Sequence, residues 1–404
     1  MRMRIGRTLP PAGSPLYVQD ILSGISGLFT GDHRVKNFES ELASFFQVKT
    51  CFAVSSGKAA LALILQALHE LYPERDEVLI PAYTCFSVPS AIIRAGLRVQ
   101  LCDMEPGKLD FDFESLEKKM KSRHLLCVIP THLFGRTADV ERVKQMAAHS
   151  NIVVVEDAAQ AMGGSTNERK AGTMGDVGLF SLGRGKAFST VEGGLILTDN
   201  DLIGQALRKQ MCSVDRYGLF DNLKLVFSAV ALSILIYPSL YWLPTLLPFL
   251  KLGKTEFNPA FPIKRLSSFQ AGLAQRWQLR IAELNETRLK NSHKIAAYYT
   301  SMLGDFGALF PELLRYPVLT ANVDIKKMIL AKSDELGLGI SGGYPDSIDG
   351  IKELGNIFEE NGFPQARDIA ARIVSLPVHR FVKERDILSI VELLNINNEL
   401  MYAK

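Results

Sequence analysis

Alternating hydrophobic and polar segments organise the first half of the chain. Short apolar runs rich in β-branched residues are typical of buried strands, and the segments between them carry apolar residues at helical spacing. Strands and helices that alternate in this way predict right-handed crossovers and a mainly parallel sheet covered on both faces. The predicted strands are CFAV, EVLIP, VQLCD, LLCVIP, NIVVVED, VGLFSL and GLILTD, and the predicted helices are Lys58–Leu71, Val88–Ala95, Phe113–Lys121 and Ala138–His149.

The pattern changes after Lys264. The later predicted elements are a long helix over roughly Ser267–Leu303, a strand LRYPVLTA, a helix over Ile325–Leu336, a strand RIVSLPV and a helix over Glu384–Asn395. Strands and helices in this mixture predict a separate α+β domain. We therefore expect an α/β protein in three parts: an N-terminal segment with a large domain over residues 1–222, an apolar insertion over 223–254, and a long connecting helix with a small domain over 255–404.

The insertion has the most unusual pattern in the sequence, because no charged residue occurs from Leu225 to Leu250. About 20 apolar residues are enough to cross a bilayer. Three prolines, Pro238, Pro244 and Pro248, argue against one straight span. Topology excludes a single crossing, because the chain on both sides of the run must pack into the same fold. A helical hairpin or a helix lying in the plane of the membrane is allowed.

Two interpretations of this run remain open. Aromatic rings prefer a membrane interface and lysines face anionic headgroups, so residues of both kinds favour monotopic contact with the inner face of the membrane. These residues are Tyr237, Tyr241 and Trp242 within the run and Lys224, Lys251 and Lys254 at its flanks. A buried helix pair or a large dimer contact can be just as apolar. Membrane contact leads to the hypothesis that the substrate is lipid-linked or is delivered to a membrane-bound pathway.

Composition and charge are ordinary for a folded protein. Of the 404 residues, 47% are hydrophobic and 22% are charged, which excludes wholesale disorder. A formal net charge of +3 does not favour a nucleic-acid partner. The five cysteines lack metal-binding spacing, so we expect reduced thiols in the cytoplasm. No long apolar run follows MRMRIGR, so no cleaved signal peptide is expected.

The segment AVSSGKAALALIL predicts a strand, a tight turn at Ser56, Gly57 and Lys58, and a helix. Gly57 lets a ligand approach the backbone, and the free N–H groups and positive dipole end of a helix attract phosphate. An ordinary helix capped by serine explains the same residues, and both interpretations stay open. A nucleotide-binding P-loop is excluded, because neither SSGKAA nor GRGKAF has Ser or Thr directly after Gly-Lys.

One acidic residue and one lysine are the candidate chemical groups of the site. Asp157 follows the strand VVVE, and Lys186 lies between glycine-rich turns further along the chain. No cluster of residues with metal-ligand spacing accompanies Asp157, so a metal is not expected. Pyridoxal phosphate requires a lysine for its aldehyde, an acid for its pyridine nitrogen and a cradle for its phosphate. The three features together therefore predict a pyridoxal-phosphate site.

Longer stretches of the sequence resemble the DegT/DnrJ/EryC1/StrS family of pyridoxal-phosphate sugar aminotransferases. The resemblance covers the chain from about Gly31 to Phe381 and implies the aspartate-aminotransferase-like (type I) fold. The matching stretches are AVSSGKAALAL, VLIPAYTCFSVPSAIIRAG, PTHLFGRTADV, VVVEDAAQAMGG, GDVGLFSLGRGKAFSTVEGGLILTD, KRLSSFQAGLAQ and RIVSLPVHRF.

The resemblance implies a role for individual residues. Lys186 would bind the cofactor aldehyde and then move the proton between substrate and cofactor, and Asp157 would pair with the pyridine nitrogen. The remaining implied cofactor-binding residues are Gln160 near the ring, Ser181, Ser56, Gly57 and Lys58 at the phosphate, and Cys85 over the ring. His132 lies where the family has a histidine beside the active site, but a satisfied core histidine explains it equally well. We therefore leave His132 out of the catalytic set.

Four positions depart from the family pattern. Lys58 replaces a threonine, and its ammonium either pairs with the phosphate or is solvated. Cys85 replaces an aromatic residue, Ile263 stands where the family has an asparagine that reaches the neighbouring subunit, and Gly343 replaces a histidine before Tyr-Pro. The last two changes fall in regions that shape the substrate pocket and the dimer, so the usual nucleotide-sugar substrate is in question.

We therefore expect a homodimeric aminotransferase that transfers an amino group from an amino acid, glutamate by resemblance, to a keto-sugar. The sugar would be nucleotide- or lipid-linked and used for surface polysaccharide or glycolipid. Three alternatives remain: a pyridoxamine-dependent sugar dehydratase, which Lys186 disfavours, another pyridoxal-phosphate enzyme with a non-sugar substrate, and a membrane-associated homologue without catalysis.

Overall fold

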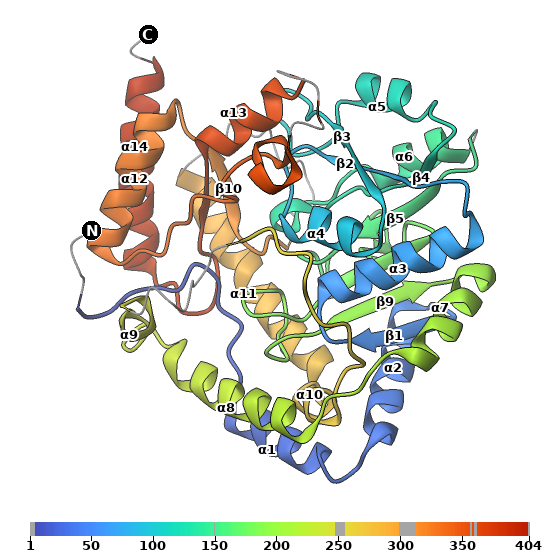
Figure 1. Cartoon of the computed structure of the whole chain (residues 1–404). Helices are drawn as coiled ribbons and strands as arrows, with labels where there is room; N and C mark the ends of the chain where they lie inside the picture. Colours follow the sequence, from blue (N-terminus) through green and yellow to red (C-terminus); the bar gives the residue numbers. More distant parts are fainter. Residues whose placement is uncertain are drawn as a thin grey trace.

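A seven-stranded sheet forms the centre of the computed structural model, which describes residues 5–148, 150–246, 255–298, 312–355, 358 and 362–402 (Figure 1). All seven predicted strands are confirmed, in the order β1-β9-β8-β5-β4-β2-β3. Five neighbouring strands from β8 to β3 run parallel, and β9 is antiparallel to both β8 and β1. The strands are β1 (Thr50–Val54), β2 (Glu77–Pro81), β3 (Arg98–Cys102), β4 (Leu125–Val128), β5 (Val153–Asp157), β8 (Val177–Ser181) and β9 (Gly194–Thr198).

Helices cover both faces of this sheet, so its central strands are apolar on both sides. Along β2, Val78 and Ile80 pack in the same cluster as α3 and α4, whereas Leu79 packs with α5 and α6. Side chains alternate between the faces of a strand, which explains this division. The α/β class and the predicted helices are confirmed as α3 (Gly57–Leu71), α4 (Ser87–Arg94), α5 (Phe113–Lys119) and α6 (Val140–Ala148), and further helices are α1 (Val18–Gly27), α2 (Asp32–Phe46) and α7 (Asp201–Ser213).

The single long helix predicted over Ser267–Leu303 is wrong, because the chain turns at residues 274–276 between α10 (Ser268–Leu273) and α11 (Trp277–Tyr298). Helix α10 lies very close to α1: a Cβ atom on Gly272 would lie 2.4 Å from the carbonyl oxygen of Ser23. Trp277 is buried in an aromatic cluster next to the sheet. The first contact holds α10 against α1 and the second holds the start of α11 next to the sheet, so the axes of the two helices point in different directions. Residues 299–303 of the predicted helix lie outside the described residues.

The C-terminal part is built around an antiparallel pair, as expected for an α+β domain. Leu9 packs in its core and Arg7 pairs with Asp386 at 2.7 Å, so the N-terminal segment joins this domain as well. Its elements are β10 (Tyr316–Leu319), α12 (Val323–Leu336), α13 (Pro364–Arg372), β11 (Ile373–Leu376) and α14 (Glu384–Tyr402). Short elements elsewhere are β6 (Ser165–Thr166), β7 (Arg169–Lys170) and 3-10 turns at Leu133–Gly135, Ile348–Gly350 and Lys352–Leu354.

The apolar insertion forms α8 (Leu219–Leu235) and a short α9 (Trp242–Thr245), while residues 247–254, including Pro248, Lys251 and Lys254, lie outside the described residues. Helix α8 runs beside α1 at the edge of the molecule (Figure 1). Leu225 and Ala229 on its inner face are buried against α1 and α10. Within the described ranges, no helix has both the length and the apolar character needed to cross a membrane.

Candidate active site

A cavity of about 700 Å³ opens at the carboxyl ends of the parallel strands, where α/β sheets bind ligands. Residues from the large domain, the insertion and the C-terminal domain all line it. The structure brings together seven of the eight site residues predicted from the sequence: Gly57, Lys58, Cys85, Asp157, Gln160, Ser181 and Lys186. The eighth, Ser56, lies directly beside the lining at the start of α3.

The turn before α3 contains the N-cap of that helix and also borders the cavity. The Ser56 hydroxyl accepts a hydrogen bond from the N–H of Ala59 at 3.1 Å, which is an ordinary N-cap. Gly57 faces the cavity and packs on Ser181: a Cβ atom on Gly57 would lie 2.9 Å from the Cβ of Ser181. The backbone at Gly57 and the hydroxyl of Ser181 therefore lie together at the positive end of a helix dipole, where an anion is favoured.

Asp157 is the acid of the cavity. Its Oδ1 accepts a hydrogen bond from the N–H of Ala159 at 3.0 Å, which fixes the carboxylate at the end of β5. Burial raises the pKa of Asp157, while this hydrogen bond and the charge of Lys186 act in the opposite direction. A cationic partner at this site would stabilise the ionised form.

Lys186 is the amine of the cavity and is held through its backbone. The Ser14 hydroxyl donates to the Lys186 carbonyl, and the buried guanidinium of Arg288 donates to the next carbonyl, Ala187, at 3.0 Å. Burial lowers the pKa of Lys186, the charges of Cys85 and Asp157 oppose this effect, and Arg315 adds to it. A lowered pKa raises the share of free amine, which is the form that attacks an aldehyde.

Asp157 and Lys186 influence each other without touching. The charge of each shifts the pKa of the other, yet among the described residues they form no direct ion pair. Both residues line the same cavity, whose volume of about 700 Å³ leaves room for a ligand. This arrangement suits a flat group that contacts both of them.

Gln160 connects the sheet to the C-terminal domain. Its Nε2 donates to the Tyr344 hydroxyl at 2.8 Å, and the Tyr344 ring lies 5.5 Å from Tyr83 and 6.4 Å from Phe134. Burial raises the pKa of Tyr344, so this hydroxyl is neutral. Tyr344 and Phe134 line the cavity together with Gln160, near which the family resemblance implies the cofactor ring.

The structure gives physical reasons for two departures from the family pattern. Gly343 has φ +74°, and a Cβ atom there would lie 2.6 Å from the Tyr83 hydroxyl, so a histidine does not fit. The Lys58 ammonium is half-buried and lies 4.5 Å from the centroid of the Phe261 ring. Burial lowers the pKa of Lys58. Its pairing with a phosphate stays a prediction.

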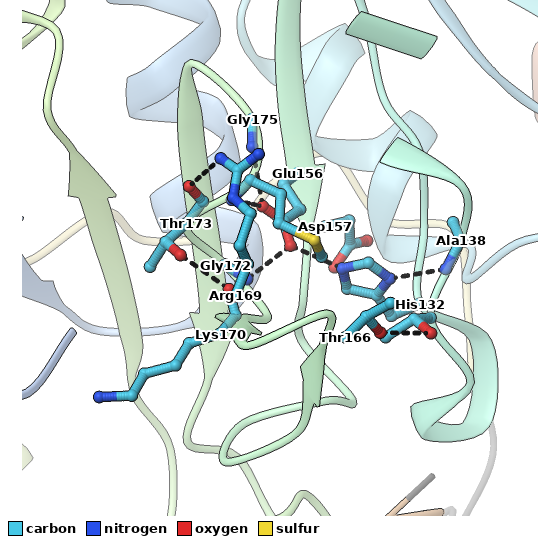
Figure 2. A network of polar contacts seen from close by, with 12 residues as sticks. His132, Ala138, Glu156, Asp157, Thr166, Arg169, Lys170, Gly172, Thr173 and Gly175 are labelled. Atoms are coloured by element: carbon cyan, nitrogen blue, oxygen red, sulfur yellow. Dashed lines mark hydrogen bonds and ion pairs between the residues drawn. The ribbon is translucent and has the colours of Figure 1, made fainter. Parts of the chain in front are cut away.

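The other acid of β5, Glu156, faces away from the cavity and is buried in a polar network (Figure 2). Its oxygens accept hydrogen bonds from the N–H groups of Gly172, Met174 and Gly175 and from His132, whose Nε2 lies 2.7 Å away. Because His132 Nδ1 accepts from the Ala138 N–H, the ring proton is on Nε2. His132 is thus a satisfied core histidine outside the cavity lining.

Two features of the cavity were missed by sequence reasoning. Arg315, just before β10, lines the cavity, although nothing in LRYPVLTA distinguishes it from a surface arginine. The insertion supplies a mostly apolar wall from α8, α9 and the turn between them: Phe227, Ser228, Ala231, Leu232, Leu235, Ile236, Tyr241 and Pro244. The uncharged run was noticed in the sequence, but its place beside the site could not be read from it.

The fold, and a cavity that contains both an acid and an amine, are typical of pyridoxal-phosphate enzymes of the aspartate-aminotransferase-like class. The profile of the DegT/DnrJ/EryC1/StrS aminotransferase family matches residues 17–395, so the chain belongs to this family. The family contains sugar aminotransferases that use pyridoxal phosphate, and solved structures with this fold include a pyridoxal-phosphate form.

Individual relatives agree with this assignment. Spore coat polysaccharide biosynthesis protein SpsC of Bacillus subtilis is 26% identical over 370 residues, which cover 91% of this chain and 90% of SpsC. GDP-perosamine synthase of Vibrio cholerae is 30% identical over 169 residues, 42% of this chain, and the match spans 45% of that protein. The Helicobacter pylori aminotransferase PseC, involved in pseudoaminic acid biosynthesis, has the same fold with a TM-score of 0.76 at 17% identity, covering 97% of this chain and 100% of PseC.

The residues present fit pyridoxal phosphate. Asp157 and Lys186 line a cavity of about 700 Å³, and only glycine fits at position 57, where the backbone meets Ser181. Asp157 would hold the ring nitrogen, Lys186 the aldehyde carbon, and the turn at Ser56 and Gly57 with Ser181 the phosphate. These assignments stay predictions for the residues concerned.

Proposed function

We propose that this protein is an aminotransferase that moves an amino group from an amino acid, glutamate in the first instance, to a keto-sugar used for surface polysaccharide or glycolipid. One observation carries the proposal: Asp157 and Lys186 line one cavity of about 700 Å³ together with Gly57 at the start of α3. Bound pyridoxal phosphate would supply an aldehyde that binds amines and a pyridine ring that accepts electrons.

The residues of the chain have separate roles in this proposal. Lys186, with its lowered pKa, carries the proton to and from the substrate carbon. Asp157 keeps a proton on the ring nitrogen, because an ionised carboxylate stabilises a neighbouring positive charge. Ser181 and the turn at Gly57 hold the phosphate, and the aromatic wall at Tyr344 limits the entry of water.

A two-step spectroscopic assay tests the proposal. Glutamate is added to the protein loaded with pyridoxal phosphate, and the visible-edge absorbance should disappear as the cofactor takes up the amino group. Addition of a nucleotide-linked or lipid-linked keto-sugar should restore that absorbance and produce an amino-sugar. If no amino acid changes the absorbance of the loaded protein, the proposal is wrong.

The insertion supports a lipid-linked acceptor and contact with the inner face of the membrane. Ala231, Leu232 and Leu235 of α8 wall the cavity, whereas Leu219 and Phe220 at its start are 74% and 86% exposed. One helix therefore presents apolar side chains both to the cavity and to the outside. A surface of this kind favours an acceptor that carries an apolar chain and approaches from a lipid interface.

We expect the exposed side of α8 to control binding to lipid vesicles. The triple variant Leu219→Glu, Phe220→Glu and Leu223→Glu should lower affinity for anionic vesicles at least about tenfold, since each apolar side chain contributes about 1.5–3 kcal/mol on burial. Vesicle flotation measures this change. Leu202→Glu on α7, which replaces a leucine that is 61% exposed, is the matched control. Equal flotation of the triple variant and the wild type would exclude membrane contact through α8.

A homodimer is the second part of the proposal, as the family resemblance implies. Val18 and Leu22 on α1 and Phe29 in the turn that follows it are 70%, 60% and 86% exposed, which is unusual for apolar side chains on so short a segment. We expect Leu22→Asp with Phe29→Asp to weaken self-association at least about tenfold in sedimentation velocity. Val323→Asp on α12 is the control. A wild-type protein that sediments as a monomer at micromolar concentration would contradict the dimer.

A further inference from the structure

Helix α11 contacts both segments that carry the acid and the amine of the cavity. Two of its polar residues, Asn285 and Arg288, are buried and lie three positions apart, on the same side of the helix. Nη1 of Arg288 donates to Oδ1 of Asn285 at 2.8 Å. The two side chains therefore hold each other and form one polar unit, which we call the α11 pair.

Asn285 binds the turn that follows Asp157. Its Nδ2 donates to the carbonyl of Met162 at 3.3 Å. A Cβ atom on the next residue, Gly163, would lie 2.6 Å from this Nδ2, so the helix and the turn are in close contact. One half of the α11 pair thus fixes the chain just after the acid of the cavity.

Arg288 binds the segment that carries Lys186. Its Nη2 donates to the carbonyl of Ala187 at 3.0 Å and also lies 3.4 Å from the carbonyl oxygen of Lys186. The same Nη2 donates to the Ser14 hydroxyl at 3.3 Å, and this hydroxyl donates to the Lys186 carbonyl. The other half of the α11 pair thus fixes the backbone from which the Lys186 side chain starts.

Stability alone does not explain an arginine at this position. Burial lowers the pKa of Arg288 to about 10, so the guanidinium is charged at neutral pH, and no described carboxylate acts on this pKa. Its Nε is buried without a hydrogen bond to the described residues. A buried charge without a counter-charge is unfavourable, and an apolar side chain of similar length would avoid this cost.

We propose that Arg288 is a positioning residue, which together with Asn285 sets the place of Lys186 relative to Asp157. The inference rests on the proposed function, because that function requires the acid and the amine to reach two ends of one rigid ring. The lysine has to meet the aldehyde carbon while the acid holds the ring nitrogen. A displacement of about 1 Å from such a geometry can lower a rate about 10²-fold.

The test measures how fast Lys186 captures the cofactor in Arg288→Met. Protein freed of cofactor is mixed with pyridoxal phosphate, reduced with borohydride at successive times, and analysed by peptide mass spectrometry. The rate of attachment at Lys186 should fall about 10- to 100-fold, because the backbone of this residue loses a charged donor. Affinity for pyridoxamine phosphate, which has no aldehyde to capture, should change less than about threefold.

Three further variants make the test specific. Arg288→Lys keeps the charge and one donor, so its attachment rate should lie between those of the wild type and Arg288→Met. Ser14→Ala removes the second donor to the Lys186 carbonyl, should also slow attachment, and replaces Arg288→Met if that variant does not fold. Arg280→Met on the same helix removes a guanidinium that lies 3.6 Å from Asp20 and should leave the rate within about twofold.

Other results contradict the inference. If Arg288→Met and Ser14→Ala both capture pyridoxal phosphate at the wild-type rate, these contacts do not position Lys186. If attachment and pyridoxamine-phosphate affinity fall by the same factor, Arg288 only maintains the fold around the cavity. A wild type that captures pyridoxal phosphate at Lys186 but reacts with no amino acid refutes the proposed function, whereas a slower capture in Arg288→Met would still support the inference.

Discussion

Lys186→Ala is expected to lower the turnover number by at least roughly ten-thousand-fold. The variant loses the amine that binds the cofactor aldehyde and also the group that transfers the proton, and general acid–base catalysis alone contributes about 10²–10⁴-fold. Stopped-flow absorbance after mixing with glutamate measures the single-turnover rate. Cofactor should still bind through the turn at Gly57, Ser181 and Asp157, but borohydride should no longer attach it covalently to the protein.

A matched lysine separates this effect from a simple loss of charge. Lys209→Ala on α7 removes an exposed ammonium whose side chain is 74% accessible and should leave the rate unchanged. If Lys186→Ala keeps covalent cofactor after reduction, or turns over within tenfold of the wild type, a different lysine performs the chemistry and the assignment of the cavity fails.

Substitution of Glu156 is expected to have a large effect on the stability of the protein and not on catalysis. Glu156→Gln is expected to lower the free energy of unfolding by about 3–5 kcal/mol, the cost of breaking a buried charged network by removing one partner. One Glu156 oxygen accepts from His132 and Gly172 and the other accepts from Met174 and Gly175. A carboxamide must turn its NH₂ group toward donors in either orientation. Urea unfolding followed by far-ultraviolet circular dichroism measures the difference.

The pH dependence of this difference gives an independent check. Burial would raise the pKa of Glu156, but the hydrogen bonds from His132 and the backbone outweigh it, and the pKa is lowered overall. A carboxylate whose pKa is lower in the folded state adds stability above its unfolded pKa, about 4.3, and loses it as the pH falls through the folded pKa. The difference in the free energy of unfolding between the wild type and Glu156→Gln should therefore become smaller below about pH 4.5.

An exposed glutamate provides the control for both measurements. Glu141→Gln in the first turn of α6 should change the unfolding free energy by less than about 0.5 kcal/mol at any pH. Unfolding curves of Glu156→Gln that coincide with the wild type at pH 7 would show that the network in Figure 2 does not stabilise the protein.

The two acids at the end of β5 show what a sequence can and cannot assign. Neighbouring residues on a strand point to opposite faces, so Glu156 and Asp157 had to have different surroundings. Which of them faces the cavity depends on residues distant in sequence, such as His132 and the turn at Gly172. The resemblance selected Asp157, and the cavity lining agrees with that choice.

The order and chemistry of the residues in the predicted cofactor site were determined by the sequence itself. Parallel strands end at one edge of a sheet, so residues that follow successive strands gather there, and Gly57, Asp157 and Ser181 do so. Local hydrophobic patterns fixed those strands, because each needs an apolar surface on both faces. A site of this kind can be read from the chain without knowledge of distant contacts.

The places of Arg315 and of the apolar wall in the cavity were decided only by the tertiary structure. Arg315 lines the cavity, and its Nε atom is buried there without a hydrogen bond to the described residues. The apolar wall exists because α8 packs on α1 beside the cavity. The break before Trp277 has the same origin, since close packing on α1 overrides a continuous helical pattern. These features arise from contacts between segments far apart in the chain, and local periodicity contains no record of such contacts.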